Sequence, residues 1–95
     1  MPTVGVLTLE LRIDDSHSLK DKRQIVKALK DRLRHKFNVA VAEIDYQDLW
    51  QRALIAAVTV SSAHLHAASV LQNVEHEAAT LVGRMLVSTN VEWIE

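Results

Sequence analysis

Residues 3–37, TVGVLTLELRIDDSHSLKDKRQIVKALKDRLRHKF, decide the fold because they contain two hydrophobic periods in succession. Over residues 3–13 the side chains alternate, which predicts a half-buried strand. One side of this strand carries Leu7, Leu9, Leu11 and Ile13. The other side carries Val4, Val6, Thr8, Glu10 and Arg12. From residue 19 onward the apolar spacing becomes three and four, which is typical of a helix with one buried face. A strand is therefore followed by a helix, and the helix buries Ile25, Val26, Leu29, Leu33 and Phe37.

The ends of this helix carry recognisable signals. Ser18 is predicted to cap its N-terminus, with Asp21 at the third helical position. Asn38 is expected to adopt the left-handed conformation that ends many helices. The helix should therefore occupy residues 19–37.

The rest of the chain predicts a hairpin, a second helix and a last strand. Residues 39–46 and 53–61 are rich in β-branched and small apolar residues and flank a polar connection, so they should pair. Ser61 or Ser62 is expected to cap the second helix and Gly83 to stop it. The buried face of this helix should comprise Ala67, Leu71, Val74, Ala78 and Leu81. In the last strand the core positions should be Met85, Val87, Val91 and Trp93.

The element order βαββαβ predicts an α+β fold, the ferredoxin-like two-layer sandwich. Right-handed crossovers place both helices on one face of an antiparallel four-stranded sheet. At 95 residues the chain is too short for two ordinary domains. We therefore expect one domain over residues 1–95.

Composition excludes several classes of protein. There is no cysteine, which removes disulfides and thiolate chemistry, and no apolar run reaches the roughly 20 residues of a membrane span. The N-terminus lacks the features of a signal peptide, so we expect a cytoplasmic protein with no membrane contact. The two glycines permit no phosphate loop or nucleophile elbow, and the five histidines are not at metal-binding spacing. We therefore expect no enzyme activity, no metal and no cofactor.

Positive charge is concentrated in the first helix although the net charge is −1. Residues 17–36 hold eight of the eleven Lys and Arg residues against two aspartates, a local charge of +6. Helical spacing places five of them in one row: Lys20, Arg23, Lys27, Lys30 and Arg34. Such a row can contact successive RNA phosphates. An ordinary solvated surface, with Lys27 paired to Asp31, explains the same pattern, and both interpretations stay open.

The sheet face away from the helices is expected to be apolar. If the helices cover Leu7, Leu9, Leu11, Leu54 and Val58, the open side carries Val4, Val6, Thr8, Ile55, Ala57 and Thr59. This set has no stacking aromatic residue, which disfavours binding of RNA bases on the sheet. Its apolar character favours self-association, and we expect a homodimer through this face.

Two further residues stand out. Lys22 falls on the buried side of the first helix, so it must either extend its ammonium to solvent or find a partner, for which Asp14, Asp15, Glu43 and Asp45 are candidates. Trp50 lies in the hairpin connection, where it is either a recognition anchor or a cover for the end of the sheet. We favour the second role, because an indole usually buries its large apolar area.

The motif Ser18-Leu19-Lys20-Asp21-Lys22-Arg23, followed by Val41-Ala42-Glu43 and Asp48-Leu49-Trp50-Gln51, resembles the YlxP-like bacterial family of unknown function. The resemblance covers essentially the whole chain and implies a ferredoxin-like fold. Its motif positions here are Lys20, Lys22, Arg23, Glu43, Trp50 and Gln51. Members are often encoded among translation-initiation and ribosome-maturation genes, which implies a role near RNA or the ribosome. The resemblance gives no catalytic role to any of these residues.

Two hypotheses of function follow. The first is a non-enzymatic accessory protein that associates with RNA or the ribosome through the basic helix, while the open sheet face forms the dimer. The alternative is a homo-oligomeric protein-interaction module with no nucleic-acid role, whose basic helix meets an acidic protein surface. A pull-down from a nuclease-treated lysate separates them, because retention of the same partners after removal of RNA favours the alternative.

Overall fold

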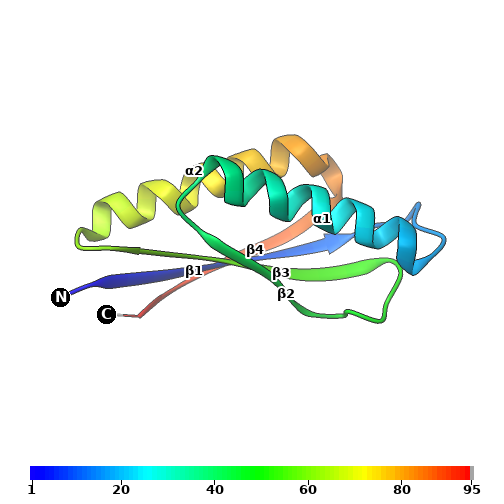
Figure 1. Ribbon diagram of the computed structural model, residues 1–95, viewed down its shortest axis with the longest axis horizontal. Helices are drawn as coiled ribbons and strands as arrows, with labels where there is room; N and C mark the ends of the chain where they lie inside the picture. Colours follow the sequence, from blue (N-terminus) through cyan, green and yellow to red (C-terminus); the bar gives the residue numbers. More distant parts are fainter. Residues whose placement is uncertain (95) are drawn as a thin grey trace.

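The computed structural model describes residues 1–94 and has the element order βαββαβ (Figure 1). A short 3-10 helix, η1 (Gly83–Met85), joins the second helix to the last strand. The main elements are β1 (Thr3–Arg12), α1 (Leu19–Lys36), β2 (Ala40–Asp45), β3 (Arg52–Ser61), α2 (His64–Val82) and β4 (Leu86–Ile94).

The four strands form one antiparallel sheet in the order β2-β3-β1-β4. Both helices lie on the same side of it, with α2 packed on β1 and β3 and α1 packed beside it toward β2 (Figure 1). The predicted ferredoxin-like sandwich is confirmed. The molecule measures 45 × 21 × 20 Å, and the chain termini lie at the opposite end from the loops that follow β1 and β2.

Helix α1 begins as predicted but ends differently. The Ser18 hydroxyl accepts a hydrogen bond from the Asp21 N–H at 3.0 Å, and the Asp21 carboxylate accepts one from the His17 N–H at 3.2 Å. At the C-terminus Phe37 is extended, and the only non-glycine residue with a positive φ in residues 1–94 is Tyr46. The left-handed Asn38 was therefore a wrong prediction, because the chain passes directly from the helix toward an extended strand.

Helix α2 ends at Gly83, as predicted, where φ is +58°. Its N-cap position is Ala63, which has no side chain to accept a hydrogen bond, so the prediction of a serine N-cap was wrong. Ser61 contributes two positions earlier, because its hydroxyl accepts a hydrogen bond from the Ala63 N–H at 3.1 Å. The last buried residue of this helix is Val82 and not the predicted Leu81, which is 39% exposed.

The core lies between the helices and one face of the sheet. Strand β1 contributes its alternating leucines, and each helix contributes the predicted three-and-four series. The central buried side chains are Leu7, Leu9, Leu11, Val26, Leu29, Leu33, Leu71, Val74 and Ala78. Burial of this apolar area, worth about 25 cal/mol per Å², is the main stabilising term of a chain without disulfides.

Strand β3 faces the opposite way from the prediction. Ile55, Ala57 and Thr59, expected on the open face, are buried beneath the helices at 0%, 0% and 3% exposure. They pair with Leu9, Leu7 and Gly5, and directly paired residues share a face of the sheet. Nearly every residue of this strand is apolar, so its own alternation cannot fix its orientation. Leu54 and Val58 therefore lie on the outer face instead.

The open sheet face is nevertheless apolar, as expected, but the residues that β3 contributes to it differ from those predicted. Val4, Val6 and Thr8 of β1 lie on it, half-buried. The residues paired with them on β3, and the next positions outward, complete the patch: Leu54, Ala56, Val58, Val60, Ala40, Ala42 and Ile94. We use the name open sheet face for these ten residues. Val60 and Ile94 are 54% and 60% exposed, which is unusual for such side chains in a monomer.

The last strand is an edge strand and is only partly covered. Val87 and Val91 are 48% and 40% exposed, so their assignment to the core was wrong. Trp93 is half-buried, and its ring contacts the His64 ring in a tilted arrangement, with centroids 4.4 Å apart and an interplanar angle of 48°. A Cβ on Gly5 would lie 2.5 Å from the Trp93 ring, so glycine at this position allows the indole to cross β1 closely.

Candidate functional site

The end of the molecule opposite the termini is held together by the side chain of Lys22. This residue is 1% exposed, and its Nζ lies 2.8 Å from the Glu43 carboxylate. It also donates hydrogen bonds to the backbone carbonyls of Tyr46 and Gln47, the second at 3.3 Å. Of the four carboxylates predicted as partners, the structure selects Glu43. One ammonium therefore joins the start of α1 to β2 and to the hairpin loop.

The hairpin loop has an unusual backbone at Tyr46. Its φ is +64°, a left-handed conformation that is rare for a bulky residue. The Asp45 carboxylate accepts a hydrogen bond from the Tyr46 N–H at 2.7 Å, and the Arg52 guanidinium lies over the Tyr46 ring, 4.1 Å from its centroid. These contacts hold the Tyr46 carbonyl toward Lys22. No glycine or asparagine at this position signalled the turn, so sequence reasoning missed it.

Gln51 fastens the same loop to the segment that follows β1. The Gln51 side-chain amide donates hydrogen bonds to the backbone carbonyls of Asp14 and Ser16 at 3.0 and 3.1 Å. The Gln51 backbone carbonyl accepts one from the Ile13 N–H at 2.9 Å. Ser16, 2% exposed, turns its hydroxyl toward the Ser18 carbonyl. The motif residues Lys22, Glu43 and Gln51 are thus brought together in a network that fixes two loops.

Trp50 belongs to this loop but not to the network. Its side chain is 53% exposed, so the burial that we predicted for it is wrong. With Leu49, Arg12, Asp14, Gln51 and Arg52 it lines a cleft of about 420 Å³. We call this the Trp50 cleft. The indole is therefore displayed at the surface by a loop that other residues hold in place.

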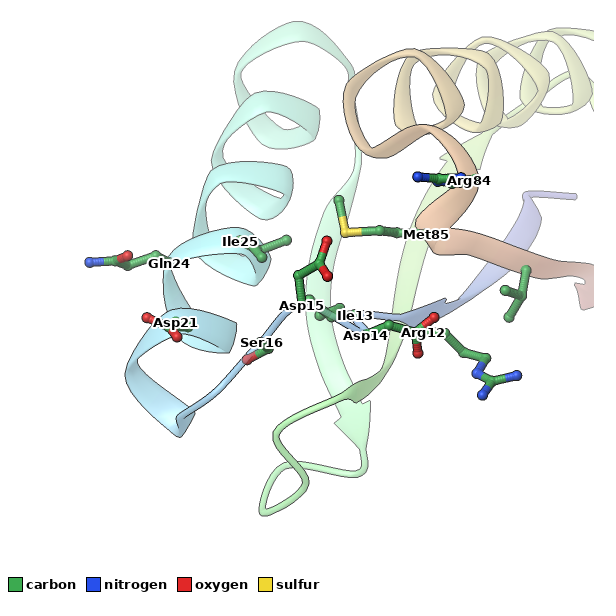
Figure 2. Close-up of a pocket in the computed structure, with 11 residues that line it drawn as sticks. Arg12, Ile13, Asp14, Asp15, Ser16, Asp21, Gln24, Ile25, Arg84 and Met85 are labelled. Atoms are coloured by element: carbon green, nitrogen blue, oxygen red, sulfur yellow. The ribbon is translucent and has the colours of Figure 1, made fainter.

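A larger cleft of about 770 Å³ adjoins it and shares Arg12 and Asp14 (Figure 2). Figure 2 shows its lining side chains coming from the end of β1, the first turns of α1 and η1. Three carboxylates and two guanidinium groups meet apolar Ile25 and Met85 there. This mixture of charges selects neither anions nor cations.

The basic stripe, Lys20, Arg23, Lys27, Lys30 and Arg34, lies on the flank of α1 above edge strand β2. Arg34 sets this position, because its guanidinium donates a hydrogen bond to the Val41 carbonyl of β2. The predicted Lys27–Asp31 ion pair is present at 2.5 Å, and the hydrogen bond from Lys27 lowers the pKa of Asp31. Two of the five cations therefore have partners within the chain.

The other three cations of the stripe are Lys20, Arg23 and Lys30, and their side chains make no hydrogen bond or ion pair within residues 1–94. Lys20 and Arg23 are exposed, and Lys30 is half-exposed. Their positions span ten residues of helix, or about 15 Å at 1.5 Å per residue. The stripe therefore presents a row of free positive charge on one side of the molecule.

The opposite flank of α1 uses its cations to join the two helices. Arg32 and Lys36 contact the Glu77 carboxylate of α2 at 3.0 and 2.7 Å. The hydrogen bond from Lys36 is the main reason why the pKa of Glu77 lies below its ordinary value. The local charge of +6 is therefore only partly available to a ligand.

The described part of the chain holds neither a candidate membrane span nor a candidate metal site. No helix within residues 1–94 is both long and apolar enough to cross a membrane. Across the same residues, no three His, Asp or Glu side chains gather in a group suited to a metal ion. The candidate site therefore comprises the basic stripe and the end of the molecule that carries the β2–β3 hairpin loop and the segment after β1.

Comparison with known proteins gives a family and a fold. The family model described as "Protein of unknown function (DUF503)" matches residues 4–91. The uncharacterized protein YlxP of Bacillus subtilis is 41% identical over 71 residues, which cover 75% of this chain and 77% of that protein.

Among solved structures, the de novo designed protein Foldit4 superposes with a TM-score of 0.61 at 9% identity, covering 100% of this chain and 98% of that one. A dimeric ferredoxin-like protein of unknown function from Thermobifida fusca superposes with a TM-score of 0.54 at 15% identity, covering 98% and 90%. At such low identity these likenesses show the fold alone.

Proposed function

Because this chain belongs to the DUF503 family of proteins of unknown function, we propose its role from its own surface: a non-enzymatic accessory protein that binds RNA through the basic stripe. The observation that carries the proposal is the row of free cations at Lys20, Arg23 and Lys30. Cations fixed at intervals along a helix suit the regularly spaced charges of a nucleic-acid backbone.

The charge distribution predicts the kind of binding. The chain as a whole carries a net charge of −1, so it has no general attraction to polyanions. Attraction comes from one flank, where a few phosphates are neutralised and their counterions released. Binding is therefore weak and strongly dependent on salt. Ribosomal RNA in the cytoplasm is the proposed target, as the resemblance to the YlxP-like family implies.

We expect the double variant Lys20→Gln with Lys30→Gln to bind a structured ribosomal RNA fragment several-fold more weakly than the parent protein. Each phosphate contact contributes about 0.7 to 0.9 to the slope of log affinity against log salt, so the slope should fall by about 1.4 to 1.8. Fluorescence anisotropy between low and moderate salt measures both quantities.

The matched control is Arg84→Glu. It also lowers the net charge by two, but Arg84 is an exposed residue of η1 and lies off the stripe. The control should keep the parent slope. Equal slopes for the parent and the Lys20/Lys30 variant would reject the stripe as the phosphate contact, and a parent protein with no salt-dependent binding would reject the RNA function.

A second proposal concerns the open sheet face, which we propose to be the interface of a homodimer. Its support is the apolar patch that the central strands β1 and β3 share, with Val60 of β3 and Ile94 of the edge strand β4 more than half exposed. One structural neighbour, the Thermobifida fusca protein, is described as dimeric. Two sheets packed face to face about a twofold axis bury such a surface.

We expect Val58→Glu to convert the dimer into a folded monomer. Val58 lies near the centre of the open sheet face, where a carboxylate would have to enter the interface without a partner. Sedimentation or light scattering gives the mass. Leu65→Glu is the control, because Leu65 is 83% exposed on α2 and should leave the dimer intact. A parent protein that is monomeric at high concentration would contradict the proposal.

The interaction module without a nucleic-acid role remains the alternative. It requires the dimer and an acidic protein partner for α1, and it requires no RNA. Retention of the same protein partners after nuclease treatment of a lysate, together with no RNA affinity at low salt, would favour it over the RNA function.

A further inference from the structure

We infer that the Trp50 cleft is a binding site for an unpaired nucleobase of the RNA, with the phosphates on either side of that base directed toward the neighbouring cations. This inference rests on the proposed function and specifies it, because it makes single-stranded RNA or an RNA loop the preferred ligand. It begins from an aromatic side chain for which the fold has no visible use.

Trp50 is exposed although the chain has ample apolar surface to bury it against. The side chain is 53% accessible, and neighbouring Leu49 is 45% accessible. The other tryptophan of the chain, Trp93, packs over Gly5 and against the core. An exposed indole can stack on a base, and each such contact contributes about 1 to 3 kcal/mol to binding of single strands.

The loop that carries Trp50 is fixed before any ligand arrives. Gln51, the next residue, donates two hydrogen bonds to backbone carbonyls across the end of the sheet. Lys22 holds the carbonyls of Tyr46 and Gln47 on the other side of the loop. Little conformational freedom is therefore lost when a base stacks on the indole, and preorganisation of this kind raises affinity.

The lining of the cleft suits a base better than a phosphate. The Arg12 side chain makes no hydrogen bond or ion pair within residues 1–94, whereas the Arg52 side chain is held by the Glu10 carboxylate at 2.7 Å. Asp14 also lines the cleft, and its carboxylate repels a phosphate while it can accept hydrogen bonds from the amino groups of a base. A base therefore enters the cleft, and Arg12 is left to meet the backbone beside it.

The cleft also lies at the end of the molecule where the proposed phosphate-binding surface begins. Lys22 bonds directly to the hairpin loop from the first turns of α1, so the basic stripe begins at the end of the molecule where Trp50 is displayed. One strand of RNA can therefore contact both. In an A-form duplex the bases are already stacked on one another, so only an unpaired base is free to stack on Trp50.

The test compares Trp50→Ala with Trp50→Phe on two probes, a 12-nucleotide single strand of mixed sequence and a perfect duplex of the same sequence. We expect Trp50→Ala to weaken single-strand binding by about fivefold to a hundredfold, while duplex binding stays within about twofold of the parent. Trp50→Phe should keep most of the single-strand affinity. In a Trp93→Phe background, the single strand should also quench the fluorescence of Trp50.

The outcomes separate this inference from the function on which it rests. Salt-dependent RNA binding that is lost in the Lys20/Lys30 variant but unchanged in Trp50→Ala would overturn the base-binding cleft and leave the stripe in place. A parent protein that binds neither probe would overturn both. Unquenched Trp50 fluorescence at saturating single strand would also overturn the cleft, whatever the affinities are.

Discussion

Lys22→Met is expected to lower the free energy of unfolding by about 3 to 5 kcal/mol, the largest effect of any single polar substitution in this chain. The variant leaves the Glu43 carboxylate partly buried without its cation and the carbonyls of Tyr46 and Gln47 without their donor. Removal of one member of a buried pair costs this much because the remaining charge stays desolvated. Urea unfolding followed by circular dichroism measures the change.

Lys27→Met is the matched control. It removes the same kind of side chain from the same helix, but the Lys27–Asp31 pair is exposed, and such pairs contribute little to stability. The control should therefore cost a small fraction of the Lys22 effect. Addition of Glu43→Gln to Lys22→Met should recover part of the loss, because it removes the unpaired charge. Similar costs for the two methionine variants would show that the Lys22 contacts do not hold the loop end.

Ile55→Ala is expected to cost about 2 to 5 kcal/mol of unfolding free energy. Ile55 is fully buried between the sheet and the helices, so truncation removes apolar contacts and leaves a cavity. Thermal and urea unfolding both report the loss. The substitution also tests which face of β3 is turned toward the helices.

The control for Ile55→Ala is a substitution at the neighbouring residue, Leu54, which faces the other side of the sheet. Leu54 has the same side-chain volume but lies half-buried on the open sheet face, so Leu54→Ala should cost less than half as much in the monomeric state. The Val58→Glu background keeps the comparison free of any dimer. A larger cost for Leu54→Ala than for Ile55→Ala would contradict the observed register.

Two groups of residues in the candidate site have different roles. Lys22, Glu43 and Gln51 are occupied by contacts within the chain, so substitutions there act first on stability and loop position. Trp50 and the free cations of the stripe make few contacts, so their substitution should leave the fold intact and change binding. This division lets stability and ligand affinity be measured as separate properties.

The sequence alone determined the element order, the start of α1, the end of α2 and the face of β1 that is buried. These features depend on neighbours within one or two turns, such as the Ser18 cap and the leucines of β1, and local spacing records them. It also placed Lys22 on the buried side of α1. Each of these conclusions follows from spacing or interactions that are short-range along the chain.

Only the tertiary structure decided which side of β3 is buried, which carboxylate meets Lys22 and whether Trp50 is covered. In β3 the apolar residues are nearly continuous, so the pairing with β1 fixed its faces. The choice of Glu43 follows from how α1 packs on β2, and the exposure of Trp50 follows from how the hairpin loop is fastened to the segment after β1. Local periodicity carries no information about contacts of this kind, because they are set by the alignment of whole strands and loops.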